Sequence, residues 1–311
     1  MAKRRRVSGK KRAAQTSIYG VLVLLIALAA YFLHPYIADL FDKGGSEGTT
    51  VTADGELAVH FIDIGQGDAI LLRFPTGENM LIDTGDRDGS NTLVKYLEAQ
   101  SIKTLDYLVL THAHSDHIGE AYDVLSNFKV KNLWMSSKTS TTKTYLNILE
   151  KAEELGLEID TPFRGEKYKV GEGQFTILSP VDGENYEDIN DSSIVMKFEY
   201  GSFSIMFTGD AESPAEESIL SAYGASALRC DILKCGHHGS SSSTSDAFLD
   251  AVSPKYAVIS CGTGNSYGHP HKETMMKLNA KGLEILRTDT QGTIVVTTDG
   301  EKLDVHTTKG N

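Results

Sequence analysis

The chain has few cysteines, since its 311 residues include only Cys230, Cys235 and Cys261. An odd number of cysteines without a Cys-x-x-Cys spacing excludes a disulfide framework. Cys230 and Cys235 fall on one expected strand, roughly 16 Å apart, which is too far for a disulfide bond. Cys235 could meet Cys261 only if their strands are neighbours. We therefore interpret the three thiols as small apolar core residues.

Basic residues are also scarce outside the N-terminus. The chain has 30 Lys and Arg against 42 Asp and Glu, and seven of those cations lie within residues 1–17, which contain no acid. The other 23 cations leave the remainder of the chain with a net charge near −19. Such a surface is poorly suited to non-specific binding of a polyanion over a broad area. A phosphate-bearing substrate would have to be held locally, by metal ions and a few cations.

One long apolar run is present near the N-terminus. Residues 18–33 carry no charge, and residues 34–37 extend the run toward the ~17–20 residues that span a bilayer. Tyrosines at both ends and the preceding cations predict a membrane anchor over residues 18–37, behind a basic cytoplasmic arm over residues 1–17. The rest of the chain would then lie outside the cell. Two alternatives stay open, a secretory signal cut after Ala29 or Ala30 and a buried soluble helix.

The chain beyond the apolar run divides into a linker and one domain. Residues 38–56 are poor in apolar side chains and indicate a flexible linker, and residues 57–308 alternate strands with helices. This order predicts an α/β (α+β) fold of two sheets packed face to face with helices outside. We expect strands at 57–64, 69–74, 79–83, 105–110, 130–135, 174–179, 193–200, 203–208, 231–234, 256–261, 284–288, 293–298 and 303–306. Helices are expected at 91–100, 120–128, 142–155, 246–252 and 271–281, with another that starts at Ser213 as its N-cap.

The segment Thr111–Gly119 concentrates three imidazoles and one carboxylate directly after a buried strand. Imidazoles removed from water need hydrogen-bond or metal partners, and ligation supplies them. In an extended segment His112 and His114 point to the same side and can hold one ion. The turn that follows presents Asp116 and His117 to a second ion. A lone histidine would more often be a surface or core residue, but four such residues together predict a metal site.

The His-x-His-x-Asp-His spacing is similar to that of the metallo-β-lactamase fold hydrolases. Together with Phe61–Asp68 and Leu233–Ser240, it resembles the soluble domain of ComEC-type DNA-uptake proteins and related phosphodiesterases, over roughly residues 57–300. The resemblance implies an αββα sandwich and two divalent metal ions, Zn or Mn. It implies that residues 57–308 form a hydrolase domain.

The resemblance also assigns roles to residues that are distant in sequence. It makes Asp210 the carboxylate that bridges two ions, and one residue of the pair His237 and His238 the last ligand; we choose His237 and leave His238 to face the substrate. Asp83 matches the aspartate that holds the histidine loop in shape. Asp68 is an ambiguous candidate for a similar role. The alternatives are ordinary turn-forming or helix-capping aspartates.

The sequence departs from most members of this family because it has no histidine between His117 and Asp210. Residues 190–193, Asn-Asp-Ser-Ser, take that place and resemble the Asn-x-x-Ser pattern of the ComEC-type subgroup. The first ion would then have two histidines, Asp210 and water, or an oxygen from Asn190 or Asp191. A site richer in oxygen tolerates manganese as well as zinc.

Further polar residues are candidates for contact with substrate. His269, in a Gly-rich loop after a strand, could act as a general acid or oxyanion donor; an exposed loop histidine is the alternative. Ser240, in a run of four serines, could hold a phosphate oxygen, although a solvated linker explains the run equally well. Lys234 and Asn190 complete the expected substrate contacts, and Asp116, His238 and His269 the expected catalytic set.

We therefore expect a membrane-anchored extracellular hydrolase in which two cations activate water. The expected substrate is a phosphodiester, with DNA in the ComEC-like manner as a candidate. With one spanning segment the chain cannot form the channel of those proteins. Another ester is the alternative, such as a choline phosphodiester, a lactone or a β-lactam. A surface binding module with a structural metal centre is a different class that also stays open. No protein partner follows from the sequence.

Overall fold

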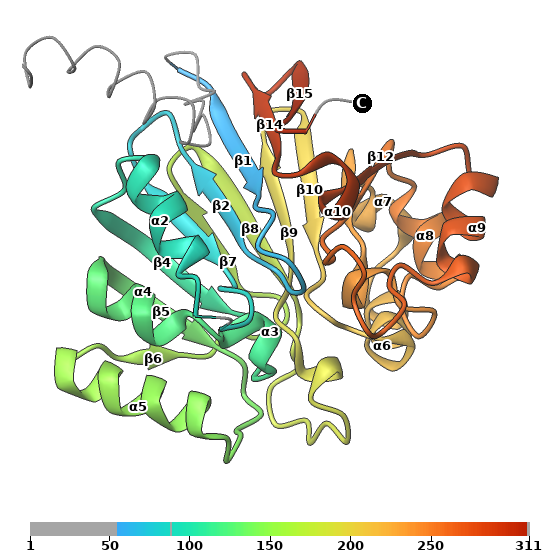
Figure 1. Ribbon diagram of the computed structural model, residues 1–311. Coiled ribbons are helices and arrows are strands. Elements are labelled where there is room, and N and C mark those ends of the chain that lie inside the picture. The colour runs from blue at the N-terminus through green and yellow to red at the C-terminus, as the bar shows by residue number, and fades with distance from the viewer. Residues whose placement is uncertain (1–54, 88, 310–311) are drawn as a thin grey trace, which may run out of the picture. The chain divides into compact units, whose positions relative to one another are not determined.

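The computed structural model describes residues 55–87 and 89–309 (Figure 1). The predicted arm, the predicted anchor and nearly all of the predicted linker lie outside the described residues. Within the described ranges, no helix combines the length and apolar character needed to cross a membrane.

Two mixed sheets form the centre of the described part. The first has the order β15-β14-β1-β2-β3-β4-β5-β6 and the second the order β13-β12-β11-β10-β9-β8-β7. The first sheet contains β1 (Leu57–Phe61), β2 (Ile70–Arg73), β3 (Asn79–Ile82), β4 (Thr104–Leu110), β5 (Lys129–Met135), β6 (Ile159–Asp160), β14 (Ile294–Thr298) and β15 (Leu303–Thr307). The second contains β7 (Lys167–Val170), β8 (Gly173–Ser179), β9 (Val195–Tyr200), β10 (Phe203–Phe207), β11 (Ile232–Lys234), β12 (Tyr256–Ile259) and β13 (Glu284–Arg287).

Helices cover the outer face of each sheet, as Figure 1 shows. Apolar side chains of α2, α4 and α5 pack on the first sheet, and those of α6, α8 and α9 pack on the second. The described helices are α2 (Thr92–Ala99), α3 (Ser115–Ile118), α4 (Ala121–Asn127), α5 (Lys143–Leu155), α6 (Ser213–Ala222), α7 (Ala225–Leu228), α8 (Asp246–Val252), α9 (Lys272–Ala280) and α10 (Thr288–Gln291), with short 3₁₀ turns η1 (Asn190–Ser192) and η2 (Gly236–Gly239).

The core lies between the sheets. Alternate residues of β1, β2 and β14 point inward and meet the inward residues of β8, β9 and β10. The rings of Phe61 and Phe207 meet across this interface, with centroids 6.5 Å apart. Because strand side chains alternate between faces, the other set of each strand packs under the helices. The predicted arrangement of two packed sheets with outer helices is confirmed.

The strand directions explain where polar residues gather. β1, β2 and β3 form an antiparallel meander, and β3, β4 and β5 then run parallel. In the second sheet β10, β11, β12 and β13 are parallel. The carboxyl ends of parallel strands meet at one edge of a sheet. Loops after β1, β3, β4, β10, β11 and β12 therefore come together at one end of the sandwich.

Some predicted elements differ from those observed. The first strand ends at Phe61 rather than at residue 64. Helix α6 begins with Ser213 as its first residue, because Glu212, with extended backbone, occupies the cap position. The edge strands β6 and β7 were not expected, since β6 is only two residues long and β7 has few apolar residues.

Candidate metal centre

The loop after β4 brings two histidine nitrogens together. His112 is buried, and its Nε2 lies 3.1 Å from Nδ1 of His114. The backbone of His114 is extended, and α3 begins at the next residue. This local geometry lets the two rings present nitrogens to one point, as the sequence spacing predicted.

His117 faces the centre from the first turn of α3. Its Nδ1 lies 2.8 Å from Oδ2 of Asp83, and its Nε2 lies 3.1 Å from Oδ1 of Asp210. Asp83 follows β3 and also accepts hydrogen bonds from the backbone N and the hydroxyl of Thr111, at 2.8 and 2.7 Å. Asp83 thus ties both ends of the histidine loop together and fixes the orientation of the His117 ring.

Asp210 lies between the two halves of the centre. It follows β10 and is buried, with Oδ2 at 3.8 Å from Nε2 of His112 and at 3.4 Å from Nε2 of His238. The preceding Gly209 has a φ of 51°, and a Cβ there would lie 2.9 Å from the hydroxyl oxygen of Thr111. Glycine is therefore required for Asp210 to approach the histidine loop so closely.

The two histidines after β11 differ in position, although both have left-handed backbone conformations. His238 is buried, its Nδ1 donates to the carbonyl of Ser260 at 3.0 Å, and its Nε2 lies 3.2 Å from Oδ2 of Asp116. The side chain of His237 is 25% exposed, and its Nε2 lies 3.7 Å from Asp210. We chose His237 as the ligand, but the structure places His238 in the buried cluster, because the peptide between them turns the second ring inward.

Asp68 joins the cluster from the turn after β1. Ligand atoms of Asp68, His117, Asp210 and His238 all lie within 4.8 Å of one another. Oδ1 of Asp68 is 3.3 Å from Nδ1 of His238. A Cβ at Gly67, which has a φ of +121°, would lie 2.1 Å from the carbonyl oxygen of Asp116. Only glycine therefore allows this turn to approach the histidine loop.

The separations between ligand atoms suit metal ions. Two ligands bound at about 2.0–2.1 Å to a tetrahedral ion lie about 3.3 Å apart. The observed pairs are His112 with His114 at 3.1 Å, His117 with His238 at 3.2 Å, and His238 with Asp116 at 3.2 Å. Oδ1 of Asp210 is buried, and although Nε2 of His117 lies 3.1 Å away, no group among the described residues meets this oxygen in hydrogen-bond geometry. The residues present therefore fit divalent cations.

The charges at the centre lead to the same conclusion. Four carboxylates, those of Asp68, Asp83, Asp116 and Asp210, contact the histidines of the centre, and only Asp68 among them pairs with the buried ammonium of Lys234. Such an excess of negative charge away from water needs compensation by protons or by metal ions.

The pKa values of the imidazoles follow from this excess. Burial alone would lower the pKa of His117 and of His238, but the nearby carboxylates, Asp210 foremost, raise both well above the usual value. His112 lies apart from most of these carboxylates. Burial and the neighbouring His117 therefore lower its pKa. Burial alone would raise the pKa of Asp210, but His117 and His238 outweigh it and lower the pKa.

The expected contact between Lys234 and a substrate is wrong. Lys234 is fully buried; its ammonium lies 2.7 Å from Oδ2 of Asp68 and donates to the carbonyl of Cys235 at 3.0 Å. Burial alone would lower its pKa, but the carboxylates of Asp68 and Asp210 raise it. Lys234 lies at the end of β11, whose side chains alternate, and this residue points between the sheets toward Asp68. It supports the centre from behind.

Glu212 was missed by the sequence analysis. Its Oε1 accepts hydrogen bonds from Nδ1 of His237 at 2.8 Å, the hydroxyl of Ser242 at 2.9 Å and Nδ2 of Asn190 at 3.3 Å. The sequence Gly-Asp-Ala-Glu contains it only two residues after Asp210, but no spacing marks it out. Asn190 and Ser240, both expected to contact substrate, are largely buried in the shell around this carboxylate.

A hydroxyl from residues 190–193 contacts the histidine loop. Oγ of Ser193 lies 3.4 Å from Nδ1 of His112 and accepts a hydrogen bond from the backbone N of Asp210 at 3.2 Å. Oδ1 of Asp191 accepts from the backbone N of Glu212 instead. Residues 190–193 therefore support the centre through hydrogen bonds without belonging to the cluster of ligand atoms.

His269 lies beside the two histidines after β11. Its ring centroid is 5.3 Å from that of His237 and 6.1 Å from that of His238, and the residue is 9% exposed. Burial, together with His238 and His237, lowers its pKa to about 4. The alternative of an exposed loop histidine does not hold.

Comparison with known proteins agrees with this geometry. The family model of the Metallo-beta-lactamase superfamily matches residues 62–263, which is more than half of the chain. The chain belongs to this superfamily. Its members are generally metal-dependent hydrolases, and the fold implies divalent metal binding at the centre described above.

The relatives within the superfamily include competence proteins. The chain is 36% identical over 261 residues to ComE operon protein 3 of Bacillus subtilis (strain 168), covering 78% of this chain and 33% of that protein. It is 31% identical over 273 residues to Competence protein ComA of Neisseria gonorrhoeae, covering 88% and 37%. These homologues are consistent with ComEC-type competence proteins, as the sequence motifs indicated. The chain spans about a third of their length.

A solved structure shares the fold. A mutant of the CmlA beta-hydroxylase matches with a TM-score of 0.50 and 14% identity, over 78% of this chain and 54% of that one. At this identity the likeness concerns the fold alone.

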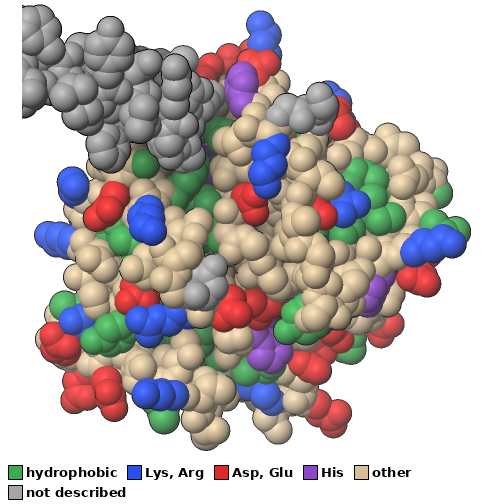
Figure 2. Space-filling model, in the orientation of Figure 1, with side chains coloured by type: hydrophobic (Ala, Val, Ile, Leu, Met, Phe, Trp, Pro, Cys, Tyr) green, Lys and Arg blue, Asp and Glu red, His purple; other side chains and the backbone are tan. Residues whose placement is uncertain are grey.

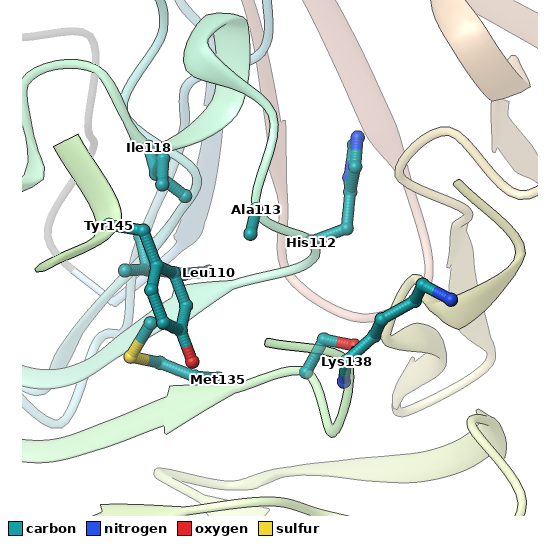
Figure 3. A pocket seen from close by; sticks show the side chains of 8 residues that line it. Leu110, His112, Ala113, Ile118, Met135, Lys138 and Tyr145 are labelled. Atoms are coloured by element: carbon teal, nitrogen blue, oxygen red, sulfur yellow. The ribbon is translucent and has the colours of Figure 1, made fainter. Parts of the chain in front are cut away.

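A small hollow adjoins the superfamily's histidine loop (Figure 3). Apolar side chains form one side of it, and His112 and Lys138 lie at the other, as Figure 3 shows. Its lining consists of Leu110, His112, Ala113, Ile118, Met135, Ser136, Lys138 and Tyr145.

Proposed function

We propose that this chain is a metal-dependent phosphodiesterase that cleaves nucleic-acid strands, DNA in particular, with two divalent cations of zinc or manganese. The observation that carries the proposal is the position of Asp210 between two groups of ligand atoms. A phosphodiester suits two adjacent cations because its attacking and leaving oxygens both carry developing negative charge. The competence-protein relatives add support for DNA as substrate.

The ligand atoms divide into two groups around Asp210. His112 and His114 would hold one cation, and Asp116, His117 and His238 the other. When bound, such cations activate water at neutral pH and polarise the phosphoryl oxygen. The absence of a third histidine favours manganese as well as zinc at the first position.

Hydrogen bonds with other residues of the chain orient these ligands. Asp83 accepts from Nδ1 of His117 and the Ser260 carbonyl accepts from Nδ1 of His238, so that each Nε2 is free to bind a cation. The rings of His237 and His269 border the same space, where a substrate oxygen could contact them.

The proposal is tested with the purified full chain. It is loaded with manganese or zinc and assayed on labelled single-stranded DNA, a small aryl phosphodiester and the β-lactam nitrocefin. We expect cleavage of both phosphodiesters, loss of activity in a chelator and its return with metal. Asp210→Asn is the matched variant and should lack both activity and full metal loading. Turnover of nitrocefin alone would reject the proposal, and metal binding without turnover of any substrate would favour a binding module.

We also propose that residues 18–37 anchor the chain in the cell membrane, with the hydrolase domain outside. The uncharged run and the cations before it support this topology. Protease added to intact cells should digest the domain and spare the N-terminal arm. Digestion only after cell lysis would contradict it.

A further inference from the structure

The loop between β12 and α9 carries an exposed aromatic ring beside the metal centre. Tyr267 is 63% exposed, the largest exposed fraction among the large apolar residues of the described chain. Its ring stacks on that of His269, with a centroid distance of 5.6 Å and an angle of 20° between the planes. A large apolar ring left in water near a site is a candidate binding surface.

His269 holds this ring in place from beneath. Asn265 donates to the carbonyl of His269 at 2.6 Å and accepts from its backbone N at 2.9 Å, so the loop closes on itself. The His269 ring is nearly buried and contacts the ring of His237 at 5.3 Å. One face of Tyr267 is therefore covered, and its other face is open to solvent.

We infer that the open face of Tyr267 is a stacking platform for a nucleobase of the single strand cleaved at the metal centre. This inference rests on the proposed function and names a residue that would hold the nucleic-acid substrate. The ring centroid of His269 lies 5.6 Å from that of Tyr267 and 5.3 Å from that of His237. Successive nucleotides of a stacked strand are about 3.4 Å apart, so the base belongs to a nucleotide a few positions from the scissile bond.

The negative net charge of the protein leaves room for stacking to add affinity for a strand beyond what the cations at the centre supply. The chain carries a formal net charge of −12. Lys and Arg side chains are scattered over the face in Figure 2 and form no continuous track. A protein of this net charge offers a polyanion little affinity through counterion release. Stacking on an aromatic ring needs no positive charge, contributes about 1–3 kcal/mol per base and tolerates any base sequence.

The first test measures binding. Fluorescence anisotropy of a labelled short oligodeoxythymidylate is recorded with the manganese-loaded full chain carrying Asp116→Ala, which slows cleavage of the probe. In this background we expect Tyr267→Ala to weaken binding roughly tenfold or more and Tyr267→Phe to retain it. An oligonucleotide of equal length without bases should bind weakly and equally to all variants. Tyr122, 37% exposed on α4, gives the matched control Tyr122→Ala, which should bind normally.

The second test uses cleavage by chains with Asp116 intact. Tyr267→Ala should raise KM for single-stranded DNA roughly tenfold with little change in kcat, and leave cleavage of the base-free strand unchanged. Equal losses on both strands, or none on either, would overturn the inference. If DNA is bound through Tyr267 but not cleaved, the proposed function is wrong and the stacking platform is supported. If DNA is cleaved without dependence on Tyr267, the platform fails while the function stands.

Discussion

Replacing Lys234 by methionine should destabilise the protein by about 3–5 kcal/mol, because the change leaves a buried carboxylate without its partner. The ammonium of Lys234 lies 2.7 Å from Oδ2 of Asp68, and the side chains are 0% and 2% exposed. The methionine fills a similar volume, so the cost reports the charge rather than a cavity. Asp68 would then have to take up a proton or draw in water.

A double-mutant cycle isolates this pair. Asp68→Asn together with Lys234→Met removes both charges, and we expect the double variant to be more stable than Lys234→Met alone by about 2 kcal/mol or more. Lys309 and Asp63 supply a matched control, since they are also 2.7 Å apart but Lys309 is 54% exposed. Lys309→Met should cost less than about 1 kcal/mol, because water screens an exposed pair.

Urea unfolding of the metal-free chain, followed by circular dichroism, gives the free energies of unfolding for this cycle. The chelator is needed because a bound cation would also compensate Asp68. A loss below about 1 kcal/mol for Lys234→Met, or strictly additive losses in the double variant, would refute the reasoning.

Three further predictions concern the centre and the core. Asp116→Ala should lower kcat on phosphodiesters at least about 1000-fold, measured by initial rates, and leave the circular dichroism spectrum unchanged, since the core strands do not depend on this side chain. Asp83→Asn should weaken metal binding about 10- to 100-fold in a metal titration, because the His117 ring loses its charged acceptor. Burial lowers the pKa of His60 to about 3 in the folded chain, against about 6.5 in the unfolded chain. Between these two pH values the imidazole is protonated only in the unfolded chain. The free energy of unfolding should therefore be unaffected by His60 above pH 6.5 and lower by about 3 kcal/mol at pH 4 because of it. Urea unfolding at pH 7 and pH 4 should show that His60→Gln lacks this decrease.

Each of these three predictions has an outcome that would contradict it. Full activity of Asp116→Ala would mean that the centre is misplaced, and unchanged metal affinity of Asp83→Asn would mean that the orientation of His117 does not matter for binding. Parallel loss of stability with acid in wild type and His60→Gln would show that His60 is protonated in the folded chain.

Much of the fold followed from the sequence because its causes are local. Short apolar runs separated by turn residues predicted the strands β1 to β3, and the Asp246–Val252 helix has the predicted bounds. The edge strands β6 and β7 depend on pairing with neighbours rather than on their own residues, so their sequence gave no signal. Helix α6 lost its expected cap because the backbone of Glu212 is already extended.

The sequence alone determined the chemistry of the centre, since His112, His114, Asp116 and His117 lie within six positions and need only a strand and a turn to converge. Tertiary structure decided what completes it. His117 and His238 are 121 residues apart in sequence and 3.2 Å apart in space. The choice of His238 over His237, and the burial of Lys234 against Asp68, depend on how the two sheets bring their strand ends together. Those contacts arise from packing of the whole core, which no short stretch of sequence encodes.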